Sequence, residues 1–130
     1  MVDVPKDWFW EGHVVEAIAR GVKLDGWLEM GRADTATRQR GVDLRLVRGD
    51  RTLLVEAKGY PSSAYRDPKR VGEIKPTRPA AQAQHWFAHA IFAGLRLQAN
   101  NPGDGVALGF PDVGRYRSLA QEIHHSFHRL

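Results

Sequence analysis

Asp43, Glu56 and Lys58 are the residues of this chain whose types and spacing best suit chemistry. They lie in the stretch GVDLRLVRGDRTLLVEAKG, residues 41–59, which is otherwise largely apolar. Two carboxylates can hold a divalent cation together with waters and phosphate oxygens, and a nearby lysine can contact a phosphate. The pattern therefore indicates a metal and phosphate site, or else a solvated strand face on which Lys58 and Arg45 screen the two acids.

The same stretch predicts a β-hairpin with strands at about 41–48 and 51–58 and a turn at Gly49-Asp50. With a two-residue loop, the numbers of facing residues sum to 99, so Asp43 faces Glu56. Facing Cβ atoms lie about 4.5–5.5 Å apart, a distance at which like charges destabilise a sheet unless a counter-charge is present. Alternation then puts the acids and Lys58 on one face and the core residues on the other: Leu44, Leu46, Leu53 and Val55.

The remaining periodicity predicts one α/β domain, residues 1–130, in the order α-β-β-β-α-β-α, with a mixed sheet flanked by helices. A long basic loop, residues 59–79, follows the hairpin. The other expected elements are helices at about 7–24, 80–98 and 115–128 and strands at about 27–32 and 106–110.

This combination resembles the PD-(D/E)XK nuclease superfamily, which has the restriction-endonuclease-like fold. The motif of this superfamily is similar to Asp43 followed, after twelve residues, by Glu56-Ala57-Lys58. A Pro often precedes the first acid of the motif, and Val42 stands at that position here. The α-β-β-β-α-β core of that fold matches the predicted order from about Trp8 to Phe110. The stretches WFWEG, ADT and VEAKGYPS are also similar to small, poorly characterised bacterial members.

The resemblance implies a metal-dependent deoxyribonuclease, an endonuclease that hydrolyses phosphodiester bonds with metal-activated water. Asp43, Glu56 and the backbone carbonyl of Ala57 would bind Mg²⁺ or Mn²⁺ as cofactor. Lys58 would orient or deprotonate the attacking water and stabilise charge on the phosphorus.

Two further residues are candidates for the catalytic set, and the first of them, Glu11, is also a candidate metal ligand. Many members add a Glu from the first helix, and Glu11 is preferred to Glu16 because it shares the apolar stripe of that helix. The alternative for Glu11 is an acid that favours the helix macrodipole. Gln82, in Gln82-x-x-x-Trp86, resembles a Gln-x-x-x-Tyr element in the nuclease domains of bacterial recombination helicases, with Trp in place of Tyr. The alternative is a polar helix position beside a core Trp.

Charge and composition indicate the partners. The net charge is +4, the pI is near 9.8, and there are 14 Arg against 5 Lys, a bias that suits phosphate contacts. The residues expected to contact DNA phosphates are Arg38, Arg40, Arg66, Lys69, Arg70, Lys75 and Arg78. Arg32 would join them at the rim of the site. The alternative is that the basic loop is only a solvated loop.

The remaining expectations concern location and alternatives. The chain has no Cys, no apolar run of membrane-spanning length and no signal-peptide pattern, so a cytoplasmic location is expected. His124, His125 and His128 are read as charge at a helix end rather than as a metal site. A non-catalytic nucleic-acid-binding module or an accessory subunit that kept the fold is the alternative function, and a homodimer or protein partner is possible.

Overall fold

The computed structural model describes residues 10–33, 42–61 and 78–127. Within them the predicted order of elements is confirmed, with ends shifted by up to four residues from the sequence prediction. The elements are α1 (Glu11–Lys23), β1 (Leu28–Arg32), β2 (Leu44–Arg48), β3 (Arg51–Ala57), α2 (Pro79–Asn100), β4 (Gly105–Gly109) and α3 (Gly114–Phe127).

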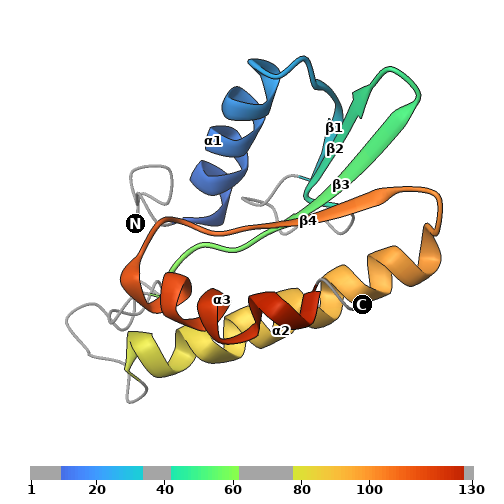
Figure 1. The fold of residues 1–130 in the computed structure, drawn as a ribbon. Helices are drawn as coiled ribbons and strands as arrows, with labels where there is room; N and C mark the ends of the chain where they lie inside the picture. Colours follow the sequence, from blue (N-terminus) through green and yellow to red (C-terminus); the bar gives the residue numbers. More distant parts are fainter. Residues whose placement is uncertain (1–9, 34–41, 62–77, 128–130) are drawn as a thin grey trace.

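The four strands form one mixed sheet in the order β1-β2-β3-β4 (Figure 1). β1, β2 and β3 are antiparallel neighbours, and β4 pairs in parallel with β3. The predicted hairpin register is confirmed, because Leu44 pairs with Val55 and Leu46 with Leu53. Gly49 has a φ of +64°, the left-handed conformation that a tight hairpin turn requires.

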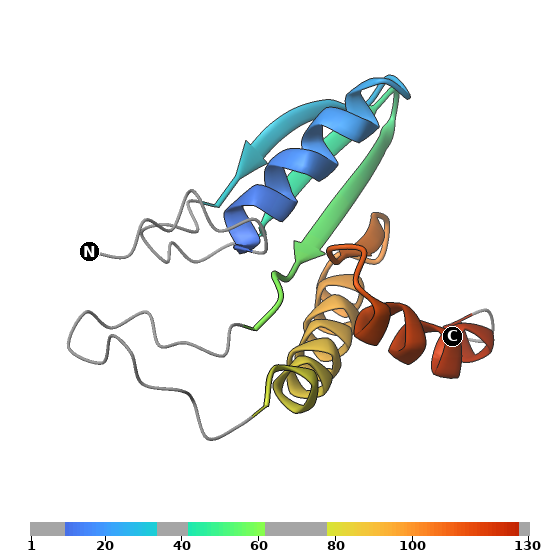
Figure 2. The same cartoon turned by 90° about the vertical axis from the view of Figure 1, so that its left-hand side faces the viewer.

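Helices cover both faces of the sheet, with α1 on one side and α2 and α3 on the other (Figure 2). The core beneath α1 joins Val14 and Val15 to β2 and β3. The second core joins α2 to α3 through Ala83, Phe87, Tyr116 and Leu119. No helix in the described ranges has the length and apolar character needed to cross a membrane.

The expectation of a single apolar face on β3 is wrong. Leu54 is fully buried although it points to the same side as Glu56, because α2 packs against that side of β3. Gly94 allows close packing of α2 on the sheet, since a Cβ there would lie 2.8 Å from Cδ2 of Leu108. The acids therefore lie at the carboxyl end of β3, not on an open strand face.

Candidate active site

Backbone contacts fix the chain around the predicted motif. Lys58 follows the last residue of β3, and its N–H donates to the carbonyl of Gly109 at 3.0 Å, which continues the pairing with β4. One residue later, the hydroxyl of Tyr116 donates to the carbonyl of Gly59 at 2.7 Å, inside the core between α2 and α3. Glu56 and Lys58 are thus carried on a segment that is held from two sides.

Asp43 lies directly before β2 and is 9% exposed. Its Oδ2 accepts a hydrogen bond of 2.8 Å from the backbone N–H of Ala57. This bond ties the residue before one strand to the end of the next and places Asp43 beside Glu56, as the hairpin register predicts. The bond itself was not predicted.

Lys58 lies between two carboxylates. Its Nζ is 3.7 Å from Oε1 of Glu56 and 4.0 Å from Oε1 of Glu11, the first residue of α1. The structure thus brings Glu11 to the motif, as the apolar stripe of the helix predicts. Glu16 instead makes ion pairs with Arg20 and Arg32 away from the motif.

The electrostatics of this cluster are dominated by buried negative charge. Burial raises the pKa of Glu56 to about 7, the carboxylates of Asp43 and Glu11 add to the rise, and Lys58 opposes it. Burial also raises the pKa of Asp43, although the Ala57 N–H and Lys58 partly offset it. One lysine does not balance the acids around it.

A pocket of about 290 Å³ opens beside Glu11 and Lys58. Its opposite wall comes from α2 and consists of His85, Trp86 and His89. The two histidines were missed from the sequence, although their spacing of four residues on a predicted helix places them on one side of it.

Gln82 lies one turn before Trp86 on α2. Its Oε1 is buried and has no hydrogen-bond partner among the residues that the structure describes. Buried polar atoms are normally paired, so an unpaired amide oxygen is consistent with a ligand or water contact. Its predicted catalytic role stays a prediction.

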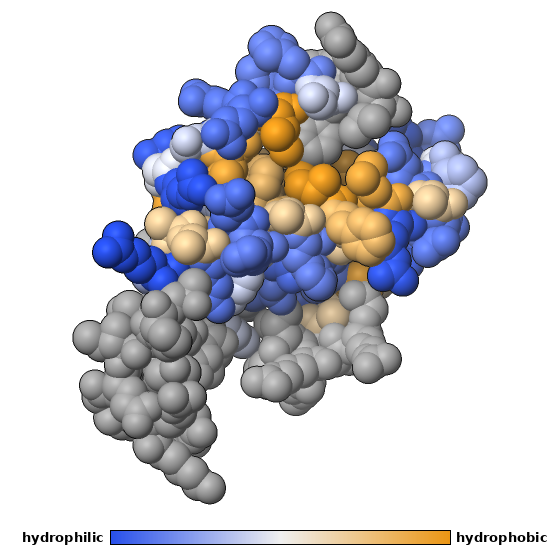
Figure 3. Space-filling view, turned by 90° about the horizontal axis from the view of Figure 1, so that it is seen from below, coloured by the Kyte–Doolittle hydropathy of each residue, from blue (hydrophilic) through white to orange (hydrophobic). Residues whose placement is uncertain are grey.

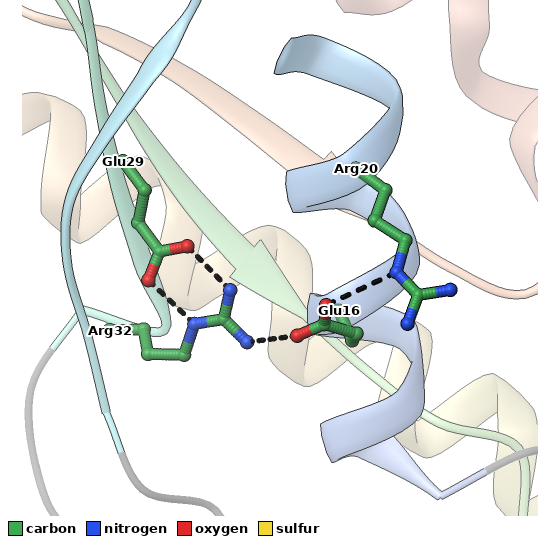
Figure 4. Close-up of polar contacts among 4 residues, drawn as sticks. All are labelled: Glu16, Arg20, Glu29 and Arg32. Atoms are coloured by element: carbon green, nitrogen blue, oxygen red, sulfur yellow. Dashed lines mark hydrogen bonds and ion pairs between the residues drawn. The ribbon is translucent and has the colours of Figure 1, made fainter.

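Arg32, predicted from the sequence to lie at a phosphate-contacting rim, is paired with carboxylates of its own chain, and its contact with phosphate stays a prediction. Its guanidinium binds both oxygens of Glu29, at 2.7 and 2.5 Å, and an oxygen of Glu16 at 2.6 Å (Figure 4). Arg32 in turn lowers the pKa of Glu16 and of Glu29. The arginine is therefore committed to carboxylates of its own chain.

Most of the predicted DNA-contacting residues lie outside the described residues: Arg38, Arg40, Arg66, Lys69, Arg70 and Lys75. Arg78 is exposed and immediately precedes α2. His124 and His125 are exposed in the last turn of α3, where positive charge favours the helix dipole.

Possible metal ligands in the structure form a partial set. Within residues 10–33, 42–61 and 78–127, no three His, Asp or Glu side chains are arranged to hold a metal ion. Asp43 and Glu56 supply two side-chain oxygens, and the carbonyl of Ala57 is the further oxygen that the sequence motif predicts. No family model, curated protein or solved structure matches this chain.

Proposed function

We propose that the protein is a metal-dependent phosphodiesterase that hydrolyses DNA. The observation that carries the proposal is the convergence of Glu56 and Glu11 on Lys58, with Asp43 held beside Glu56 by the Ala57 N–H. Acids and a lysine at the end of a strand, next to a pocket, form a set that can support metal-assisted phosphodiester hydrolysis.

The charge of the cluster fits a divalent cation. Two buried neighbouring carboxylates, one with a pKa of about 7, are stabilised in their ionised form by any cation that binds between them. Carboxylate and carbonyl oxygens are the ligands that Mg²⁺ and Mn²⁺ prefer. Asp43, Glu56 and the carbonyl of Ala57 would hold the ion, which would lower the pKa of a bound water and offset the charge of the phosphate.

Lys58 and Glu11 would have different roles in the reaction. Lys58 is 20% exposed and flanked by Glu56 and Glu11. It would orient the attacking water and stabilise charge that develops on the phosphate oxygens. Glu11 would hold the Lys58 ammonium toward the pocket that receives the substrate. The positive net charge of the chain favours a polyanionic substrate.

The test is cleavage of supercoiled plasmid and of single-stranded DNA with Mg²⁺ or Mn²⁺, and with a chelator. Glu56→Gln and Lys58→Met should each lower the rate by about 10²-fold or more, because each removes a group that acts in the transition state. Glu29→Gln and Lys23→Met are matched controls, since they remove the same charges outside the cluster. Both should cleave like the wild type.

Two outcomes would contradict the proposal. Equal cleavage by the wild type and by Glu56→Gln would show that the activity belongs to another site. Metal-independent, salt-sensitive DNA binding without cleavage would instead support the non-catalytic binding module.

A further inference from the structure

Three aromatic side chains of α2 line one wall of the pocket beside Lys58. They are His85, Trp86 and His89. At about 3.6 residues per turn, His89 lies between His85 and Trp86 around the helix, and the three positions span about 100° of its circumference. The α2 wall of the pocket is therefore an arc of three rings.

The ring of Trp86 is not used to build the interior of the protein. Of the residues that the structure describes, neither the core beneath α1 nor the core between α2 and α3 includes it. Trp86 is half-buried at the pocket, and His85 and His89 are exposed beside it. A large aromatic side chain outside the cores, on the wall of a pocket, is available to a ligand.

The same wall is poor in the groups that bind duplex DNA through its phosphates. Arg96 is the only Lys, Arg, Asp or Glu of α2, and its guanidinium lies 5.4 Å from the ring centre of Phe92. Among the described residues that line the pocket, Lys58 is the only Lys or Arg. Seen from below, apolar residues form a band across the underside of the molecule, where α2 and α3 lie in Figure 1 (Figure 3). Duplex DNA is held mainly by Lys and Arg on its phosphates, so this wall suits contacts with bases instead.

We infer that the pocket binds an unpaired base of single-stranded DNA next to the phosphate that is cut. The inference rests on the proposed function and names its substrate class. Proteins that bind single strands stack the bases on aromatic side chains. In a duplex the bases are paired and stacked on one another, so a base reaches such a wall only when it is unpaired.

The size and position of the pocket agree with one base. Its volume of about 290 Å³ is near the lower end of the range of small-ligand sites, about 300–1,000 Å³. Glu11 and Lys58 line the pocket together with the three rings, and Nζ of Lys58 is 3.7 Å from Oε1 of Glu56. A base stacked on the α2 wall therefore has its sugar and phosphate beside the charged cluster.

Binding in the presence of a chelator tests the inference without cleavage. The probes are a fluorescent oligothymidylate and an abasic strand of the same length, which keeps the sugars and phosphates but has no bases. The wild type should bind oligothymidylate more tightly than the abasic strand. Trp86→Ala should lose roughly 5- to 150-fold in affinity for oligothymidylate, the contribution of one stacked base, and little for the abasic strand. Trp86→Phe should recover part of this loss because it restores a ring.

Two further variants complete the test. His85→Ala replaces an exposed residue and should show the same selective loss, so the inference can be tested even if Trp86→Ala does not fold. Phe92→Ala, which removes a ring of α2 that is 59% exposed and outside the pocket, is the matched control and should bind like the wild type. Equal binding of the two strands by the wild type, tighter binding of a duplex, or an equal loss in Phe92→Ala would overturn the inference.

The base-binding pocket and the proposed cleavage can fail separately. If the wild type cleaves DNA but Trp86→Ala and His85→Ala keep their affinity for oligothymidylate, the inference is wrong and the nuclease proposal stands. If binding depends on the bases and on Trp86, but no strand is cut with Mg²⁺ or Mn²⁺, the pocket is supported and only the cleavage is overturned.

Discussion

The backbone N–H of Ala57 donates a hydrogen bond of 2.8 Å to Oδ2 of Asp43, across the end of the β2–β3 hairpin. The bond occupies one oxygen of the carboxylate and leaves the other for a second partner. It also fixes the distance between Asp43 and Glu56, since Ala57 is the next residue after Glu56. A carboxylate held this way is a rigid neighbour for the ion that we propose.

The Asp43→Asn and Asp43→Ala variants should differ in their free energy of unfolding. Asp43→Asn keeps an oxygen that can accept from Ala57, whereas Asp43→Ala leaves that N–H without its partner. Asp43→Ala should therefore be less stable than Asp43→Asn by about 1–3 kcal/mol. Urea unfolding of the two variants at one pH measures the difference, and equal stabilities would show that the hydrogen bond contributes nothing.

The stability of the metal-free protein should fall as the pH rises. Glu56 has a folded-state pKa of about 7 against an ordinary value of 4.5, so the folded protein binds more protons than the unfolded chain between these values. Stability from this group is complete below about pH 4.5 and is lost as the pH rises through about 7. Urea unfolding between about pH 5 and pH 8 measures the slope.

Glu56→Gln provides the control for that slope. The variant should be more stable than the wild type at about pH 8, by about 1–3 kcal/mol, because it removes a buried charge. Glu122→Gln, on the exposed surface of α3, should leave the slope unchanged. A wild-type stability that is constant over this range would contradict the raised pKa of Glu56.

Cation binding should release protons. At about pH 7, Glu56 is about half protonated in the metal-free protein, so an ion bound to its carboxylate should displace roughly half a proton. Calorimetric titration with Mn²⁺ in buffers of different ionisation enthalpy measures this number. Glu56→Gln should release none, and proton release equal to that of the wild type would place the ion elsewhere.

Tyr116→Phe should loosen the segment that follows Lys58. The Tyr116 hydroxyl is the donor to the carbonyl of Gly59, and its ring packs edge-on against Tyr60 at 5.5 Å between centroids. Loss of the hydroxyl should cost about 1–2 kcal/mol because a buried carbonyl loses its partner. Hydrogen exchange should be faster at Lys58 and unchanged at Leu46, in the centre of β2.

Arg32→Gln should have a small effect on stability and none on activity. The Glu16–Arg32–Glu29 network is half exposed, so screening by water limits its contribution to about 1 kcal/mol or less. Urea unfolding at low and high salt measures this contribution, which should shrink as salt rises. A loss of DNA cleavage or of DNA binding would instead indicate that Arg32 contacts the substrate.

The hairpin and its register could be predicted because local rules determine them. Alternating apolar residues set the faces, and Gly49 supplies the backbone conformation of the turn. The approach of Glu11 could also be predicted, because helical periodicity places it on the side of α1 that packs on the sheet. These features depend on residues that are close in the sequence or on a single repeating pattern.

Other features depend on contacts that no local pattern contains. The ion pair of Arg32 with Glu29 forms where the pairing of β1 with β2 is irregular, between Glu29 and Gly31. The pocket wall depends on how α2 crosses the sheet. The burial of Leu54 could have been predicted from the sequence. The uninterrupted apolar run Leu53-Leu54-Val55 is typical of a strand that is covered on both faces.

The hydrogen bond from Lys58 to Gly109 has a consequence for the order of folding. All four charged residues of the candidate site lie in the first 58 positions, yet the backbone that positions Lys58 pairs with β4, and Gly59 is held by Tyr116. Contacts between such distant positions form only after a long loop closes. A chain emerging from the ribosome therefore carries all four charged residues of the candidate site before it carries Gly109 and Tyr116, which hold Lys58 and Gly59 in place.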